Sequence, residues 1–236
     1  SSDVCSSDLI SDVGFKKEKP NYISNEKCLA NAIATFPLST YKWVVLADGV
    51  SQETKEMIET HIPLENIEHI NIKNGPGYSF MYILDKLLTT SNNEDKLYFI
   101  ENDYIHKPGA DVALLEGFEL GADYITLYDH PDKYMGPSLG GNRYCSGGAE
   151  ETRVYLSDSC HWKLTNSTTA TFSTTIKTLK EDYNIIKKYA NNVYWDDFSM
   201  FLELRDKKRT LISSIPGYST HGEKAWLSPL TDWNKI

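Results

Sequence analysis

The chain has 236 residues, and its acidic residues outnumber its basic ones by 33 to 24, which gives a net charge of −9 at pH 7. This length suits one α/β domain with a substantial core. The negative charge argues against a nucleic-acid-binding surface, and no apolar run approaches the length of a membrane span. The sequence leaves the oligomeric state open.

The first nine residues do not look like protein sequence. Residues 1–9 read as an in-frame translation of a sequencing-adapter oligonucleotide. We interpret them as adapter read-through on an assembled, metagenomic gene fragment; the alternative is a genuine polar N-terminal tail. Because foreign segments are excluded before fold prediction, we expect the authentic N-terminus to be missing and the first strand to lie within 10–14. The remaining cysteines are odd in number and match no zinc spacing, which favours reduced thiols in a cytoplasmic protein.

Residues 10–134 alternate strand and helix signals. Buried-type or alternating runs predict strands at 43–47, 67–72 and 123–128, besides a central strand that starts at Lys96. Apolar residues at helical spacing predict helices at 25–36, 51–60 and 78–88, and a further helix that opens at Pro108-Gly109 and closes at Gly121. Such alternation is typical of a mostly parallel sheet with right-handed crossovers.

The pattern changes after residue 134. The glycine-rich segment 135–150 predicts a long loop, which we expect to close over a bound ligand. Beyond it we predict strands at 152–156 and 160–165, which could pair with each other. A helix follows over 173–189, another starts at Asp196 or Asp197, and a late strand spans 210–215.

The central stretch Lys96–Tyr104 carries the strongest chemical signal. Its apolar strand ends abruptly in two carboxylates, Glu101 and Asp103. Ligands of open α/β sheets bind at the carboxyl ends of strands, and carboxylates there are hard oxygen ligands for Mg²⁺ or Mn²⁺. The alternative is that both acids are merely solvated after the strand.

Other polar residues fall at comparable positions. Asp48 follows a buried strand, so a nucleotide could fit between it and the acids, although Asp before Gly also makes turns. Asp196 and Asp197 open a late helix; one of them, with Asp197 preferred, could act as a general base, or both could be N-caps. His221 follows the last strand and is either a metal ligand or a solvated loop residue.

Two further segments are weaker candidates. Asn74, Gly75 and Gly77 precede a helix whose N-terminus could face a phosphate. His161 and Trp162 could pack the floor of an acceptor site. Neither pattern is specific by itself.

The order of these residues resembles the nucleotide-binding A-type (GT-A) fold of glycosyltransferases, especially the family 2 type. The segment 48–51 resembles the Asp-rich turn that holds the nucleotide base in that family, with Ala47 in place of the usual acid. The segment 101–103 resembles its Asp-X-Asp metal motif with Glu101 at the first position, which makes Asp103 the stronger metal candidate.

Later residues continue the resemblance. Asp196-Asp197 is similar to an acidic pair that supplies the catalytic base in inverting members, and His221 to a third metal ligand. The segments 19–22, 161–165 and 218–222 are similar to a bacterial glycosyltransferase-like subgroup. The resemblance covers residues 10–236 as a single domain, with a nucleotide-binding half at about 10–134 and an acceptor and catalytic half at about 135–236.

The resemblance implies an α/β, Rossmann-like, mostly parallel sheet with helices on both faces. It also implies a glycosyltransferase of polysaccharide biosynthesis that uses Mn²⁺ or Mg²⁺, a nucleotide-diphosphate sugar donor and a glycan or lipid-linked acceptor, in the cytoplasm or at the inner face of the membrane. One alternative is a nucleotidyltransferase, which would need a basic phosphate-binding signature; Lys16, Lys17 and Lys19 form the only cluster near the first strand. Another is a catalytically silent carbohydrate-binding domain, because Glu101 and Ala47 depart from the family pattern.

Overall fold

A computed structural model describes residues 4–10, 18–145, 147 and 149–236 of the chain. Its main element is one nine-stranded sheet with the strand order β3-β2-β1-β4-β9-β6-β10-β8-β7. The strands are β1 Val4–Ile10, β2 Lys42–Asp48, β3 Ile67–Ile70, β4 Lys96–Glu101, β6 Tyr124–Thr126, β7 Val154–Leu156, β8 His161–Leu164, β9 Phe172–Thr175 and β10 Leu211–Ile215. A separate ribbon pairs β5 Tyr104–His106 with β11 Ser219–His221.

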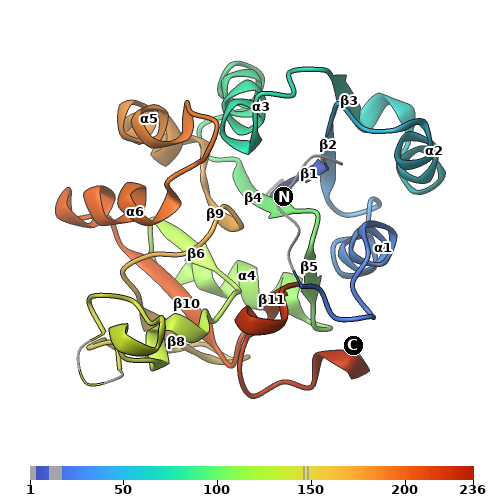
Figure 1. Cartoon of the computed structure of the whole chain (residues 1–236). Coiled ribbons are helices and arrows are strands. Elements are labelled where there is room, and N and C mark those ends of the chain that lie inside the picture. Colours follow the sequence, from blue (N-terminus) through green and yellow to red (C-terminus); the bar gives the residue numbers. More distant parts are fainter. Residues whose placement is uncertain (1–3, 11–17, 146, 148) are drawn as a thin grey trace.

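The predicted mostly parallel sheet is confirmed. β1 pairs in parallel with both β2 and β4, and Figure 1 shows it between them. β9 is antiparallel to its neighbours β4 and β6, and β8 is antiparallel to β10 and β7. The carboxyl ends of β2, β4 and β6 therefore share one edge of the sheet, and β9 begins at that same edge.

Helices cover both faces of the sheet (Figure 1). The helices are α1 Asn25–Thr35, α2 Gln52–His61, α3 Pro76–Thr90, α4 Ala110–Glu119, α5 Ile176–Ala190 and α6 Asp197–Asp206. One hydrophobic core contains buried residues of α1, α2 and α4, and a second contains those of α3, α5 and α6. No helix in the described part of the chain is long and apolar enough to cross a membrane.

The two cores follow from the strand period of two. In β4, Tyr98 and Ile100 belong to the first core, whereas Leu97 and Phe99 belong to the second. Successive side chains of a strand point to opposite faces, so Glu101 continues the row of Leu97 and Phe99 toward the α3, α5 and α6 side. The alternation of side chains along β4 thus determines the face of the sheet on which Glu101 lies.

Three elements differ from the sequence predictions. The first strand is Val4–Ile10, earlier than the predicted 10–14, whose residues after Ile10 lie outside the described part of the chain. Our hypothesis on the origin of 1–9 concerns the nucleotide sequence and stays a prediction. The helix predicted over 173–189 begins at Ile176, because Phe172–Thr175 instead fills the sheet position between β4 and β6 as β9.

The small ribbon is the third difference, because neither of its three-residue strands was predicted. Ile105 packs with Ile23, Cys28 and Trp233 in a third hydrophobic cluster, so the C-terminal segment lies back over the start of α1. Among its described residues, the segment 135–150 has no α-helix or strand and only 3-10 residues, at Pro137–Leu139 and Gly147, in agreement with the predicted loop.

Candidate active site

The ribbon brings Asp103 and His221 together. His221 pairs with Tyr104 in the β5–β11 ladder, and the Gly222 N–H donates a hydrogen bond to the Asp103 carbonyl oxygen at 2.7 Å. As a result, the His221 Nε2 lies 3.3 Å from the Asp103 Oδ2, and both side chains are at least nine-tenths buried. Two predicted metal ligands from distant parts of the sequence therefore adjoin.

Close packing fixes this arrangement. A Cβ atom on Gly222 would lie 2.6 Å from the Asp103 carbonyl oxygen, which only glycine avoids. The Tyr104 ring packs on the His221 ring with centroids 5.3 Å apart, and the Tyr104 hydroxyl is 2.6 Å from the Thr169 Oγ1. The imidazole is thus held from both its backbone and its ring face.

The donor set fits a divalent cation that also takes ligands from a substrate. No group of three or more His, Cys, Asp or Glu side chains suited to a metal is found among the described residues. Mg²⁺ characteristically uses one or two carboxylates together with substrate phosphates and water rather than an all-protein cage. Asp103 supplies one such carboxylate, and His221 adds an imidazole nitrogen beside it. The Lys19 Nζ, 3.4 Å from the Asp103 Oδ2, shows that this carboxylate attracts a positive charge.

Glu101 lies apart from the Asp103–His221 pair and contacts Thr171. Its backbone N–H donates to the Thr171 Oγ1 at 3.1 Å, and the Thr171 hydroxyl is 3.4 Å from the Glu101 Oε2. The intervening Asn102 turns toward α1, where its Nδ2 donates to the Asn25 Oδ1 at 3.2 Å. Direct metal contact by Glu101 stays a prediction.

Asp197 is the first residue of α6, and the negative charge of Glu101 acts on its carboxyl group. Burial, together with the negative charges of Glu101 and Asp196, raises the pKa of Asp197 to about 7, whereas the Phe198 N–H and the positive charge of Lys133 oppose the shift. Asp196, by contrast, is exposed and caps the helix, because its carboxylate accepts a hydrogen bond from the Ser199 N–H at 3.0 Å. The acidic pair therefore has one capping member and one with a pKa suited to proton transfer.

The sequence reasoning missed several polar residues of this site. Thr169 contacts Tyr104 and Thr171 contacts Glu101, and both lie in a threonine-rich run, which is the only signal that the sequence offers for them. Lys133 is buried, and its Nζ donates to the Asn166 Oδ1 and the Ser167 Oγ at 2.7 Å each. Burial lowers the pKa of Lys133. No sequence pattern pointed to this lysine.

Asp48 has a structural explanation besides the predicted nucleotide contact. Its buried carboxylate accepts hydrogen bonds from the backbone N–H groups of Ile72 and Lys73 at 2.8 and 3.1 Å, and from the Ser79 hydroxyl at 2.5 Å. These bonds join the end of β2 to the turn before α3. A nucleotide contact by Asp48 stays a prediction.

The glycines before α3 also pack closely. A Cβ atom on Gly75 would lie 2.3 Å from the Val193 carbonyl oxygen, and one on Gly77 would lie 2.1 Å from the Ala190 carbonyl oxygen. Gly75 moreover has a φ of +105°, a conformation that favours glycine. These residues let α3 approach the end of α5. Asn74 is exposed beside them, and phosphate binding at 74–77 stays a prediction.

The position of Trp162 does not fit the prediction that it packs the floor of an acceptor site. Its side chain is fully buried in the first core, where it packs against Gly117 of α4, and its Nε1 donates to the Ser157 Oγ at 3.0 Å. The strand alternation of β8 turns it into the core, so it cannot contact an acceptor in this conformation. His161 is exposed at the start of β8, and an acceptor contact there stays a prediction.

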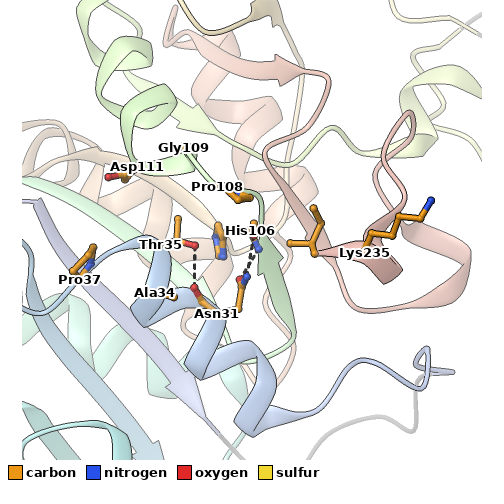
Figure 2. Close-up of a pocket in the computed structure, with 10 residues that line it drawn as sticks. Asn31, Ala34, Thr35, Pro37, His106, Pro108, Gly109, Asp111 and Lys235 are labelled. Carbon is orange, nitrogen blue, oxygen red and sulfur yellow. Dashed lines mark hydrogen bonds between the residues drawn. The ribbon is translucent and has the colours of Figure 1, made fainter.

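A separate cavity of about 420 Å³ lies between the end of α1 and the loop before α4 (Figure 2). None of the predicted site residues lines it. His106 lies in its wall, with its backbone bonded in both directions to the Asn31 side chain, and burial lowers the pKa of His106 to about 3. This histidine is neutral and joins β5 to α1.

The comparisons with known proteins rest on structure alone. No family model matches the sequence, and curated proteins show no significant similarity to it. The chain is similar to a crystal structure of GalNAc-T7 with UDP, GalNAc and Mn²⁺, at a TM-score of 0.62 and 10% identity, over 95% of this chain and 45% of that chain.

A second solved structure is more distant. The 4-diphosphocytidyl-2C-methyl-D-erythritol synthase from Anaerococcus prevotii aligns at a TM-score of 0.47 and 10% identity, over 98% of this chain and 92% of the other. That score is too low to support an argument. The match to GalNAc-T7 covers under half the length of that chain. The likeness to it shows a GT-A-like α/β fold without assigning a family.

Proposed function

We propose that the protein is a metal-dependent glycosyltransferase that moves a sugar from a nucleotide diphosphate to a hydroxyl of a glycan or lipid-linked acceptor. The observation that supports this most directly is the convergence of two groups at the carboxyl edge of the sheet. Asp103 adjoins His221 through the ribbon, and Glu101 acts on Asp197 at the start of α6. One group is suited to a cation and the other to a proton.

Asp197 acts as the general base in this proposal. An acceptor hydroxyl donates its proton to the Asp197 carboxylate while its oxygen bonds to the anomeric carbon and the bond to the diphosphate breaks. A carboxylate in water is a weak base, but a pKa near 7 matches the operating pH and improves proton transfer. A base on the face opposite the leaving group gives a product of inverted configuration.

Asp103 and His221 would hold the divalent cation, Mn²⁺ or Mg²⁺. When bound, it supplies positive charge that neutralises the leaving diphosphate. Burial of Asp103 and His221 limits the water around them, which strengthens their interaction with a bound charge. Tyr104 holds His221 in place, as its ring contact shows.

The test measures donor binding and donor turnover separately. A thermal-shift screen of nucleoside diphosphates with Mn²⁺ or Mg²⁺ identifies the nucleotide, because a ligand that binds the native state raises its apparent stability. Turnover of the matching sugar nucleotide is then measured with and without cation. Asp103→Asn should abolish metal-dependent stabilisation, whereas Asp158→Asn, an exposed control with the same charge change, should not.

The same experiment separates the alternatives. A nucleotidyltransferase would release diphosphate from a nucleoside triphosphate, and a silent carbohydrate-binding domain would turn over neither substrate. Of the basic cluster that the nucleotidyltransferase needs, Lys19 pairs with Asp103, and Lys16 and Lys17 lie outside the described residues. Stabilisation by nucleotide without metal-dependent sugar release would refute the proposal.

A further inference from the structure

A stack of two arginines and two aromatic rings lies beside the proposed base. Tyr144, 46% exposed, stacks on Phe198 of α6 with centroids 6.3 Å apart and an interplanar angle of 29°. The Arg143 guanidinium lies 5.4 Å from the Phe198 centroid, and the Arg205 guanidinium 5.2 Å from the Tyr144 centroid. Phe198 directly follows Asp197, so the stack adjoins the residue that would take the acceptor proton.

Arg143 and Arg205 differ from Arg209 in how far their charge is neutralised by ion pairs among the described residues. The chain has four arginines. Arg209 is neutralised by Asp123, Glu181 and Asp182 at 2.7 to 3.1 Å. Arg205 has only a 3.9 Å contact with the neighbouring Asp206, and Arg143 forms no ion pair among the described residues. Two exposed positive charges thus each lie 5.2 Å from the centroid of the same Tyr144 ring, in a chain whose net charge is −9.

The loop residues of the stack, Arg143 and Tyr144, are held in place by their neighbours in the chain. The Asn142 side chain is buried, donates to the Asn166 Oδ1 at 3.1 Å and accepts from the Tyr144 N–H at 3.0 Å. Cys145 on the other side is fully buried. Arg143 and Tyr144 are therefore held between two buried residues. Stacking on rings restrains a guanidinium and leaves its N–H edge available for a carboxylate or phosphate.

We propose that Arg143 and Arg205, stacked on Tyr144 and Phe198, form a subsite for an anionic sugar of the acceptor. This rests on the proposed glycosyl transfer and adds the class of acceptor to it. Each guanidinium presents paired donors that match the oxygens of a carboxylate or a phosphate. A uronate ring and a sugar phosphate share this chemistry, whereas a neutral sugar lacks it. The position beside Asp197 assigns the subsite to the acceptor rather than to the donor diphosphate.

The experiment uses three probes with the same ring: glucose, glucuronate and glucose 6-phosphate. Their binding to the full chain is measured by ligand-observed NMR in Mg²⁺ buffer. At least one anionic probe should bind about tenfold more tightly than glucose, as expected for charge-assisted hydrogen bonds. The double variant Arg143→Gln, Arg205→Gln should lose this preference. Arg153→Gln, which removes an exposed charge outside the stack, should keep it.

The outcomes are distinct. Preference for glucuronate alone identifies a uronate, and preference for glucose 6-phosphate a phosphorylated sugar; both support the subsite. Equal binding of all three probes, or an equal loss in Arg153→Gln, overturns it. So does weakened nucleoside diphosphate binding in the double variant, which would place the arginines at the donor. If the Gln variant does not fold, Arg143→Lys with Arg205→Lys tests the stack, because lysine keeps the charge without the planar guanidinium.

These measurements do not depend on turnover. A protein that binds anionic sugars through Arg143 and Arg205 but turns over no sugar nucleotide would refute the proposed function and retain the subsite. A protein that transfers sugar to neutral and anionic acceptors alike would do the reverse.

Discussion

Asp197→Asn separates catalysis from binding and from stability. Asn keeps the shape of the side chain but cannot accept a proton, and Asp196 still caps α6. Turnover should fall by about 10²- to 10⁴-fold, the usual contribution of a general base. The affinity for the nucleoside diphosphate should stay near that of the parent, because Asp103 and His221 are untouched.

The same variant should alter the pH dependence of stability. Folding raises the pKa of Asp197 from 3.8 to about 7, and each unit corresponds to 1.36 kcal/mol, so the charged carboxylate costs at most about 4 kcal/mol of unfolding free energy. The residue is only half-buried, and solvent screening reduces this to about 1–2 kcal/mol. Below about pH 4, both states hold the proton. As pH rises from about 4 to 7 the unfolded state loses its proton first, so the parent loses stability.

Denaturant unfolding of both proteins in EDTA at pH 4 and pH 8 checks this sign. The unfolding free energy of Asp197→Asn relative to that of the parent should rise by about 1–2 kcal/mol from pH 4 to pH 8. This corresponds to about 2–8 °C in Tm for a domain of this size. Equal stability differences at both pH values would refute the buried-carboxylate reasoning. A product of retained configuration, measured by proton NMR, would refute the base assignment even if the variant were inactive.

Three further predictions concern the cation site. Asp103→Ala should abolish metal-dependent nucleotide binding and preserve the circular dichroism spectrum; unchanged calorimetric affinity would contradict this. Gly222→Ala should destabilise the protein by about 1–3 kcal/mol and weaken Mn²⁺ binding, because its Cβ would meet the Asp103 carbonyl oxygen at 2.6 Å; a parental Tm with parental Mn²⁺ affinity would show that the ribbon does not hold the site. Lys19→Met keeps the aliphatic stem and removes a charge 3.4 Å from Asp103, so Mn²⁺ affinity should rise roughly threefold to tenfold in a calorimetric titration, whereas a decrease would make Lys19 part of the site.

The sequence predicted the elements whose signals are local. β2 and β4 carry buried runs, and their alternating side chains face two different cores. Ser24 and Ser51 cap α1 and α2, since their side chains accept a hydrogen bond from the backbone N–H three residues on. These features depend on a few neighbouring residues, so a single sequence contains them.

The elements that were missed depend on distant pairing. β9 is four residues long and runs directly into α5, so its pattern merges with that of a helix. β5 and β11 have three residues each and exist because they pair with each other. His221 could be proposed as a ligand by its place after the last strand, but its position beside Asp103 arises from that pairing.

The turn after β4 gives the two acids Glu101 and Asp103 different surroundings. β4 ends at Glu101, which still follows the strand's alternation and lies on the α6 side, where its charge acts on Asp197. The chain then turns through Asn102 and Asp103 into β5, so Asp103 leaves the sheet and joins His221 in the ribbon. The two carboxylates, one residue apart in sequence, therefore have different surroundings and, in the proposed function, different tasks. In the proposed function Glu101 tunes a base and Asp103 holds a cation, so the charge of Glu101 matters more there than the length of its side chain.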